Sequence, residues 1–273
     1  MNFIGIDFED WFHPELVAPF IPPEKKIPIM YKGLEKILDL LRRTDSIGTF
    51  FLVGETLKNN PEILDMILSS GHEIGFHTMN HRRLDLISNK IIFQNELKEF
   101  KKLTRNKSKG FRAPTFSLNK KSAWIIDELI KNNYKYDSSV VPAKTSMYGI
   151  PNADIAPYKI SSTCIEKNDD SSSLMEFPLM ITNFFIKRIP SAGGFYLRSL
   201  PLRIVKNSIL SYEKQNIPAS MYIHSWELTP EYFPKINLPF KNNFITFYNI
   251  KNTYTKLFDI LKTFEFKSFE SYF

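Results

Sequence analysis

Short apolar runs alternate along the chain with longer stretches in which apolar residues recur every three or four positions. The short runs are typical of buried strands and fall at residues 2–10, 47–53, 73–76, 110–112, 134–140, 219–224 and 264–269. The longer stretches have the period of amphipathic helices and fall at residues 29–43, 61–71, 88–105, 201–215 and 251–263, with a further helix that Ser117 or Asn119 caps. This alternation predicts parallel strands with right-handed crossovers, as in a barrel or a doubly wound sheet.

Two segments break this rhythm. Residues 141–175 are rich in Pro, Ser, Asn and Asp and are predicted to form a long surface excursion with short strands at most. A flexible turn is expected at Gly193 and Gly194, which are too few for a phosphate-binding loop. Because no repeat or linker divides the chain, residues 1–273 are predicted to form a single domain.

The composition is that of a globular protein, with 43% hydrophobic and 14% aromatic residues in 273. The net charge of +7 could attract a polyanion, but the lysines are spread over most of the chain. This distribution favours a solvated basic surface over a nucleic-acid groove, so no nucleic-acid partner is expected. The single cysteine, Cys164, excludes an internal disulfide and a thiolate metal cluster.

Neither a basic and apolar leader nor an apolar run of about 20 residues is present in this sequence. We therefore expect a cytoplasmic protein without a transmembrane segment, in peripheral contact with a membrane through its charge at most. The sequence carries no signal of oligomeric state.

Polar residues recur where the predicted strands end. Asp7, Glu9 and Asp10 follow the first strand, and Arg112 and His224 follow two later ones. His77 and His81 follow the third strand and are four residues apart, so on a helical turn they would project from one face. The same spacing also occurs by chance between surface histidines that bind nothing. However, the carboxyl ends of parallel strands meet at one rim of a barrel, so the carboxylates that follow the first strand are expected near this pair.

Such a set allows metal-assisted hydrolysis of an amide. Two histidines and one aspartate can hold a divalent ion with open positions for water and substrate. A second carboxylate can deprotonate the metal-bound water, and Arg112 can keep that carboxylate ionised and oriented. His224 can protonate the leaving nitrogen.

The same residues carry a family resemblance that covers nearly the whole chain. The chain resembles polysaccharide deacetylases of the NodB-homology type, carbohydrate esterase family 4, in the branch whose first motif reads Asp-x-Glu-Asp-[Trp/Tyr]-Phe-His. The matching segments occur in the family's order, at residues 7–13, 71–81, 111–117, 136–139 and 223–227. The His-Thr-x-x-His and Arg-x-Pro motifs are specific in combination, although either alone is weak.

The resemblance implies a distorted (β/α)7 barrel and loss of acetate from an N-acetylated amino sugar in a glycan or glycan precursor. It implies Asp10, His77 and His81 as ligands of one divalent ion, with Zn²⁺ the usual choice and Co²⁺, Ni²⁺ or Mn²⁺ also compatible. His224 would be the general acid, and Arg112 the partner of the base.

The first motif departs from the common Thr-Phe-Asp-Asp, in which the first Asp is the base. Here Glu9 holds that place and Asp7 lies two residues earlier. In an extended strand Asp7 and Glu9 share one face and Asp10 takes the other. Because strand ends bend, this parity leaves the choice open: Glu9 is the predicted base by its adjacency to Asp10, and Asp7 is the alternative.

Aromatic and apolar residues of the motifs are predicted to contact the substrate, since flat apolar faces suit a sugar ring. They are Trp11, His13, Pro114, Phe116 and Trp226. The same residue types are also common in ordinary hydrophobic lids and cores.

Two other functions fit the sequence. A related barrel with the same metal site can hydrolyse another C–N bond, in a formyl sugar or a cyclic amide. A non-catalytic glycan-binding protein on the same barrel is the second alternative, against which the intact acids, histidine pair, Arg112 and His224 argue.

Overall fold

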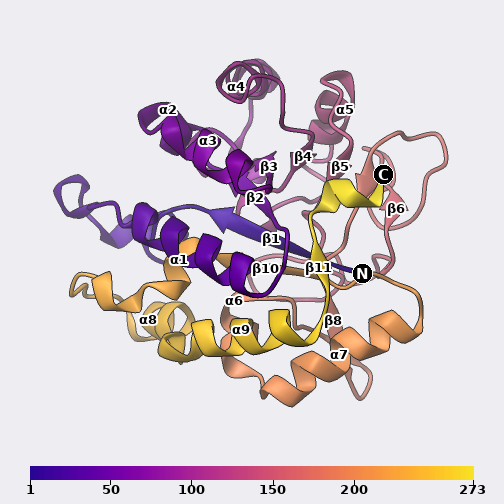
Figure 1. The fold of residues 1–273 in the computed structure, drawn as a ribbon. Helices are drawn as coiled ribbons and strands as arrows, with labels where there is room; N and C mark the ends of the chain where they lie inside the picture. Colours follow the sequence, from indigo (N-terminus) through magenta and orange to yellow (C-terminus); the bar gives the residue numbers. More distant parts are fainter.

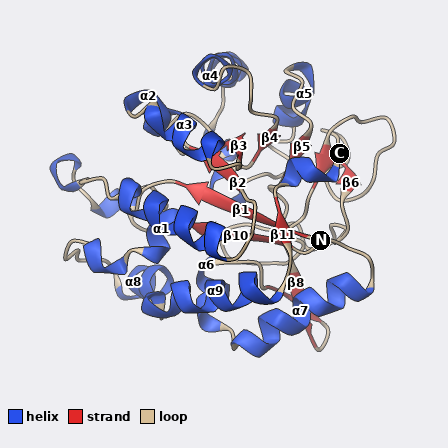
Figure 2. Cartoon of the chain, viewed as in Figure 1, coloured by secondary structure: helices blue, strands red, loops and turns tan.

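The computed structural model describes all 273 residues and shows an α/β fold whose central sheet curls into an open barrel. Figures 1 and 2 show the strands in the middle and the helices around them. The curled sheet confirms the predicted fold class, a distorted (β/α)7 barrel. None of its helices is both long and apolar enough to cross a membrane.

Eleven strands form two sheets. They are β1 Asn2–Phe8, β2 Thr49–Leu52, β3 Glu73–Phe76, β4 Gly110–Phe111, β5 Tyr136–Asp137, β6 Tyr158–Lys159, β7 Met175–Glu176, β8 Ile181–Phe184, β9 Lys187–Pro190, β10 Ser220–His224 and β11 Phe266–Lys267. The large sheet has the order β10-β1-β2-β3-β4-β5-β7-β6, with β11 paired to β1. Only β6 runs antiparallel in it, and β8 and β9 form a separate hairpin.

Nine α-helices accompany the strands. They are α1 Met30–Arg43, α2 Gly54–Asn59, α3 Glu62–Ser69, α4 Lys90–Leu103, α5 Trp124–Lys131, α6 Gly194–Ser199, α7 Leu202–Lys214, α8 Phe240–Phe247 and α9 Thr253–Thr263. The sequence pattern predicted six of them, whereas the short helices α2, α6 and α8 lie where it predicted none. The segment 141–175 contains only β6 and the start of β7, as predicted, but it also buries apolar side chains such as Ile150 and Ile160 rather than staying on the surface.

The period of two along β1 separates its core-facing residues from those inside the barrel. Ile4, Ile6 and Phe8 belong to the large apolar core. Phe3 points the other way, into an aromatic cluster inside the barrel with Phe51, Tyr136, Phe177 and Phe269. Asp7 has the same parity as Phe3, so it lies inside the barrel near the carboxyl end of the strand.

Glu73 is buried at the opposite, amino-terminal end of the barrel. Its carboxylate accepts hydrogen bonds from Thr49, Tyr136 and the backbone N–H of Glu270. Burial raises the pKa of Glu73 to about 7, although these hydrogen bonds oppose the rise. The folded protein therefore binds this proton more tightly than the unfolded chain does.

We expect Glu73 to make the protein less stable as the pH rises. Its contribution is complete below the unfolded pKa of 4.5 and is lost as the pH approaches about 7. The loss amounts to at most about 3 kcal/mol in the free energy of unfolding. Urea unfolding of the wild type and Glu73→Gln between about pH 5 and pH 8 measures it, because glutamine does not titrate. Equal pH slopes in the two proteins would contradict the prediction.

Candidate active site

The histidine pair lies in the loop that follows β3, not on a helical turn as the spacing predicted. Thr78 and His81 have positive φ angles of 60° and 51°, and these two left-handed residues fold the chain back on itself. The two imidazole rings lie 5.1 Å apart between centroids. Nδ1–H of His77 donates to the carbonyl oxygen of Arg112 at 2.7 Å, which leaves Nε2 free as a ligand.

Glu9 completes a group of three potential metal ligands with His77 and His81. One ligand atom from each of the three lies within 4.8 Å of the others. The carboxylate is buried, and its Oε2 contacts Nε2 of His81 but lacks a well-formed hydrogen bond. Burial opposes ionisation of Glu9, but His81 and the other nearby imidazoles hold its pKa well below the usual range.

Asp10, the predicted third ligand, is directed elsewhere. Its carboxylate accepts hydrogen bonds from the backbone N–H groups of Trp11, Ile29 and Met30 at 3.0 to 3.3 Å. It thereby caps the amino terminus of α1, where unpaired N–H groups favour a negative charge. The structure therefore corrects the expectation that Asp10 lies with the histidines, and Glu9 occupies that place.

Asp7 pairs with Arg112 on the inner side of the barrel. The two side chains meet at 2.8 Å, and Arg112 is fully buried. Arg112 also donates to the carbonyl and hydroxyl oxygens of Ser138, and its guanidinium lies 4.1 Å from the ring centroid of Phe51. A Cβ at Gly5 would overlap the guanidinium, so this strand position requires glycine. Arg112 is thus fixed from several sides and orients the carboxylate of Asp7.

His224 lies beside Asp7, because the two residues are paired in register between β1 and β10. Its Nδ1 lies 2.6 Å from Glu227, and its Nε2 lies 3.8 Å from Glu9. Burial lowers the pKa of His224, but the hydrogen bond and charge of Glu227 outweigh burial and raise it to about 9. The imidazole is therefore protonated at neutral pH, which suits a proton donor.

Sequence analysis assigned no role to Glu227 or to Arg198, which supports it. Arg198 is buried on α6, and its Nε lies 2.8 Å from Glu227. Two further atoms of its guanidinium donate to backbone carbonyls of residues 245–248. The position of Glu227, three residues after His224 in the last motif, was a usable signal, whereas nothing in the sequence marked Arg198.

A cavity of about 210 Å³ opens over these groups and is lined by Asp7, Glu9, His77, His81 and His224. Of the predicted substrate contacts, Phe116 and Trp226 also line it. Trp226 stacks on His224 and donates from Nε1 to Glu9 at 3.2 Å.

The other three predicted contacts do not line the cavity. Trp11 is fully buried and donates from Nε1 to the carbonyl oxygen of Ile27. Pro114 is buried at the start of the short helical turn that ends at Phe116. His13 accepts a hydrogen bond from the backbone N–H of Asp10, and its ring lies 5.7 Å from that of His81.

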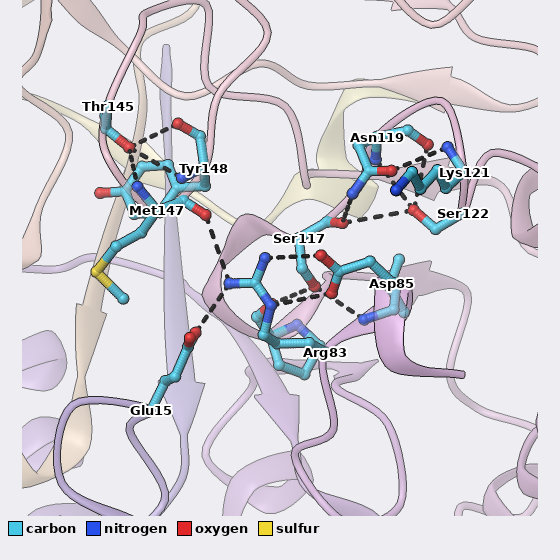
Figure 3. Close-up of polar contacts among 12 residues, drawn as sticks. Glu15, Arg83, Asp85, Ser117, Asn119, Lys121, Ser122, Thr145, Met147 and Tyr148 are labelled. Carbon is cyan, nitrogen blue, oxygen red and sulfur yellow. Dashed lines mark hydrogen bonds and ion pairs between the residues drawn. The ribbon is translucent and has the colours of Figure 1, made fainter. Parts of the chain in front are cut away.

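Arg83 joins two loops whose residues line the cavity, and Figure 3 shows its guanidinium in contact with Glu15 and Met147. Its guanidinium pairs with Glu15 at 2.8 Å and reaches the carbonyl oxygen of Met147 at 3.4 Å. Two parallel hydrogen bonds of 2.9 Å to Asp85 hold it in place. In the second loop, Thr145 Oγ1 accepts from the N–H groups of residues 147 and 148. The segment 141–175 therefore contributes to the cavity.

The three grouped side chains fit a divalent cation. Two imidazoles and one carboxylate are the donor set of many catalytic zinc sites. The hydrogen bond from His77 fixes the tautomer that a metal ligand requires. The buried Glu9 oxygen without a well-formed hydrogen bond is a donor that a cation would satisfy.

Two family models match the chain. A polysaccharide deacetylase model matches residues 29–134, and a domain of unknown function, DUF3473, matches residues 138–273. The boundary between them does not divide the sheet, because β10 from the second part pairs with β1.

Relatives of known name match shorter segments. A peptidoglycan-N-acetylglucosamine deacetylase of Bacillus cereus is 48% identical over 46 residues, 17% of this chain and 22% of that protein. The peptidoglycan-N-acetylglucosamine deacetylase PgdA of Listeria monocytogenes is 26% identical over 125 residues, 41% of this chain and 26% of that protein. The chain therefore matches only about a quarter of the length of these relatives.

Solved structures resemble the whole chain. A protein of Mycobacterium smegmatis described as a polysaccharide deacetylase superposes with a TM-score of 0.60 at 14% identity, over 97% of this chain and 86% of that chain. A protein of Pseudomonas aeruginosa with the same description gives a TM-score of 0.56 at 13% identity, over 96% of this chain and 83% of that chain. At these identities the likeness shows the fold.

Proposed function

The chain belongs to the polysaccharide deacetylase family of the NodB-homology type, carbohydrate esterase family 4, and we propose that it removes the acetyl group from an N-acetylated amino sugar of a glycan or glycan precursor. The observation that carries the proposal is the grouping of Glu9, His77 and His81 in a cavity that also exposes Asp7 and His224. Support for the substrate class comes from the relatives named for peptidoglycan N-acetylglucosamine.

In this proposal Glu9, His77 and His81 hold one divalent cation, with Zn²⁺ the first choice for this donor set. When bound, the cation supplies Lewis-acid activation of water and of the amide carbonyl. Glu9 and His81 would both be ligands of the bound cation, so Glu9 would not be available as the base.

Asp7 then takes the role of general base. It lines the cavity, and its pairing with Arg112 directs the carboxylate. The base accepts a proton from the attacking water, which is why its orientation relative to the ligands matters. The structure thus favours the alternative that the sequence left open for the base.

His224 is the proposed general acid. It is protonated through Glu227 at neutral pH and can deliver its Nε2 proton to the amine nitrogen as the C–N bond breaks. Apolar and aromatic side chains of the cavity wall, including Phe116, Tyr148 and Trp226, offer flat surfaces to a sugar ring.

The metal content of the purified protein, measured beside acetate release from a panel of N-acetylhexosamine donors, tests the proposal. We expect about one metal ion per chain and release of acetate from at least one donor. Bound metal without release of acetate would support the metal site but not the substrate, and formylated sugars and cyclic amides would then be assayed. The absence of metal after addition of Zn²⁺ would contradict the enzyme function and favour a glycan-binding protein.

A further inference from the structure

The β8–β9 hairpin carries an apolar tip that the proposed reaction does not use. Phe184 pairs with Lys187, so the tip consists of Phe185 and Ile186. The side chains of Phe184, Phe185 and Ile186 are 58%, 90% and 98% exposed. The base of the hairpin packs against α7, beside which β8 lies in Figure 1. The tip itself contributes little to any core.

The backbone at the tip is also unfavourable for the residue that it carries. Phe185 has a φ angle of 52°, in the left-handed region. In two-residue hairpin loops this conformation strongly favours glycine or asparagine, since a Cβ meets the backbone there. Neither hydration nor local backbone preference accounts for an aromatic residue at this position. Such a conflict between sequence and local structure is typical of a functional position.

Four cations surround the base of this tip. Lys144, Lys167, Lys187 and Arg188 line one surface hollow together with Ile186. None of the four pairs with a carboxylate within 4.0 Å. Arg188 donates to the carbonyl oxygens of residues 151 and 153, which fixes the hairpin against the segment that carries Lys144. The cations are therefore held beside the apolar side chains.

We propose that this surface, defined by residues 184–188 with Lys144 and Lys167, docks onto an anionic phospholipid bilayer. The apolar tip enters the interface between head groups and acyl chains, and the cations contact lipid phosphates. A protein partner fits less well, because the three apolar side chains expose roughly 500 Å², below the ~800 Å² per partner of a standard protein interface. The inference does not depend on the proposed deacetylation.

Sedimentation of the full-length protein with vesicles tests the inference. We expect binding to phosphatidylcholine vesicles that contain phosphatidylglycerol, weak binding to phosphatidylcholine alone, and loss of binding at high salt. Phe185→Gly should lower the partition coefficient about tenfold, because it removes the most deeply inserted ring. The same change should leave the melting temperature unchanged or higher, since glycine accepts the left-handed φ. Loss of binding in this variant therefore cannot be assigned to misfolding.

Charge is tested with a matched pair. Lys144→Glu should weaken binding at least about fivefold, whereas Lys98→Glu, the same charge change on the exposed face of α4, should have little effect. Three results would overturn the inference: no binding to anionic vesicles at low salt, equal binding by wild type and Phe185→Gly, or equal effects of the two lysine variants. If the first of these results is accompanied by self-association that Phe185→Gly abolishes, the surface instead binds a second copy of the chain. No substrate is present in this assay, so its outcome is separate from that of the acetate measurement.

Discussion

Replacing Glu9 with glutamine is expected to remove the metal ion, whereas replacing Asp10 with asparagine is expected to leave it bound. Glu9 lies with His77 and His81, and its charge is the only negative one in that group. Loss of a residue that hydrogen-bonds to a metal ligand typically lowers metal affinity 10- to 100-fold. Loss of the ligand itself should therefore lower it at least about a hundredfold. Deacetylation should fall about a thousandfold or more.

Asp10→Asn is the matched control, because it makes the same chemical change one residue away. The variant weakens the cap of α1 and should lower the free energy of unfolding by about 1 kcal/mol, through lost charge at the helix terminus. Metal content by elemental analysis and stability by urea unfolding separate the two effects. Loss of metal in Asp10→Asn with retention in Glu9→Gln would assign the ligand to Asp10, as the first motif alone suggested.

His77→Ala extends the test to the histidine pair. It should abolish both metal binding and activity, since the variant removes a ligand whose ring is fixed by the carbonyl oxygen of Arg112. Circular dichroism confirms that the variant is folded before metal is measured. Full deacetylation by a folded His77→Ala protein would exclude this site.

The alternation along the predicted first strand assigned each carboxylate to one face, but it did not predict the partner of each. Parity placed Asp7 and Glu9 on one face and Asp10 on the other, and the structure places Asp7 inside the barrel beside the buried Arg112. The partner of Asp10 is the amino terminus of α1, 19 residues further along the chain. Where that helix begins in space depends on the path of a proline-rich loop, which residue patterns do not specify.

The histidine pair shows a similar limit. Spacing brought the two histidines together correctly, but through a helical turn that the structure does not contain. Two residues after β3 with left-handed backbone conformations, Thr78 and His81, bring the rings together instead. Positive φ at threonine and histidine is uncommon, so local preference gives no reason to expect it. Tertiary packing around the site imposes this conformation on the loop.

Contacts from arginines on distant elements to residues of the site were the least predictable part of the structure. Arg198 reaches Glu227 from α6, a six-residue helix where the sequence indicated a flexible turn. Arg83 reaches Glu15 across 68 residues. Arginines occur along much of the chain, and only the folded structure shows which of them contact a catalytic or cavity-lining group.

Asp7→Asn is expected to lower kcat about a hundredfold to ten-thousandfold while the metal content stays at its wild-type value. Asparagine keeps the shape of the side chain but cannot accept a proton in the reaction. Because Asp7 is not among the grouped ligands, the metal site should be intact. Steady-state kinetics on metal-loaded protein, with elemental analysis of the same sample, measures both quantities.

A purely structural role of Asp7 must be separated from this one, because the carboxylate also neutralises a fully buried arginine. Loss of that charge alone would destabilise the protein by several kcal/mol, since it leaves a buried cation without its partner. Under that hypothesis the folded, metal-loaded fraction of Asp7→Asn would keep the wild-type kcat. If Asp7 is the base, the same fraction is slow. The kcat per folded, metal-loaded molecule therefore decides between the two roles.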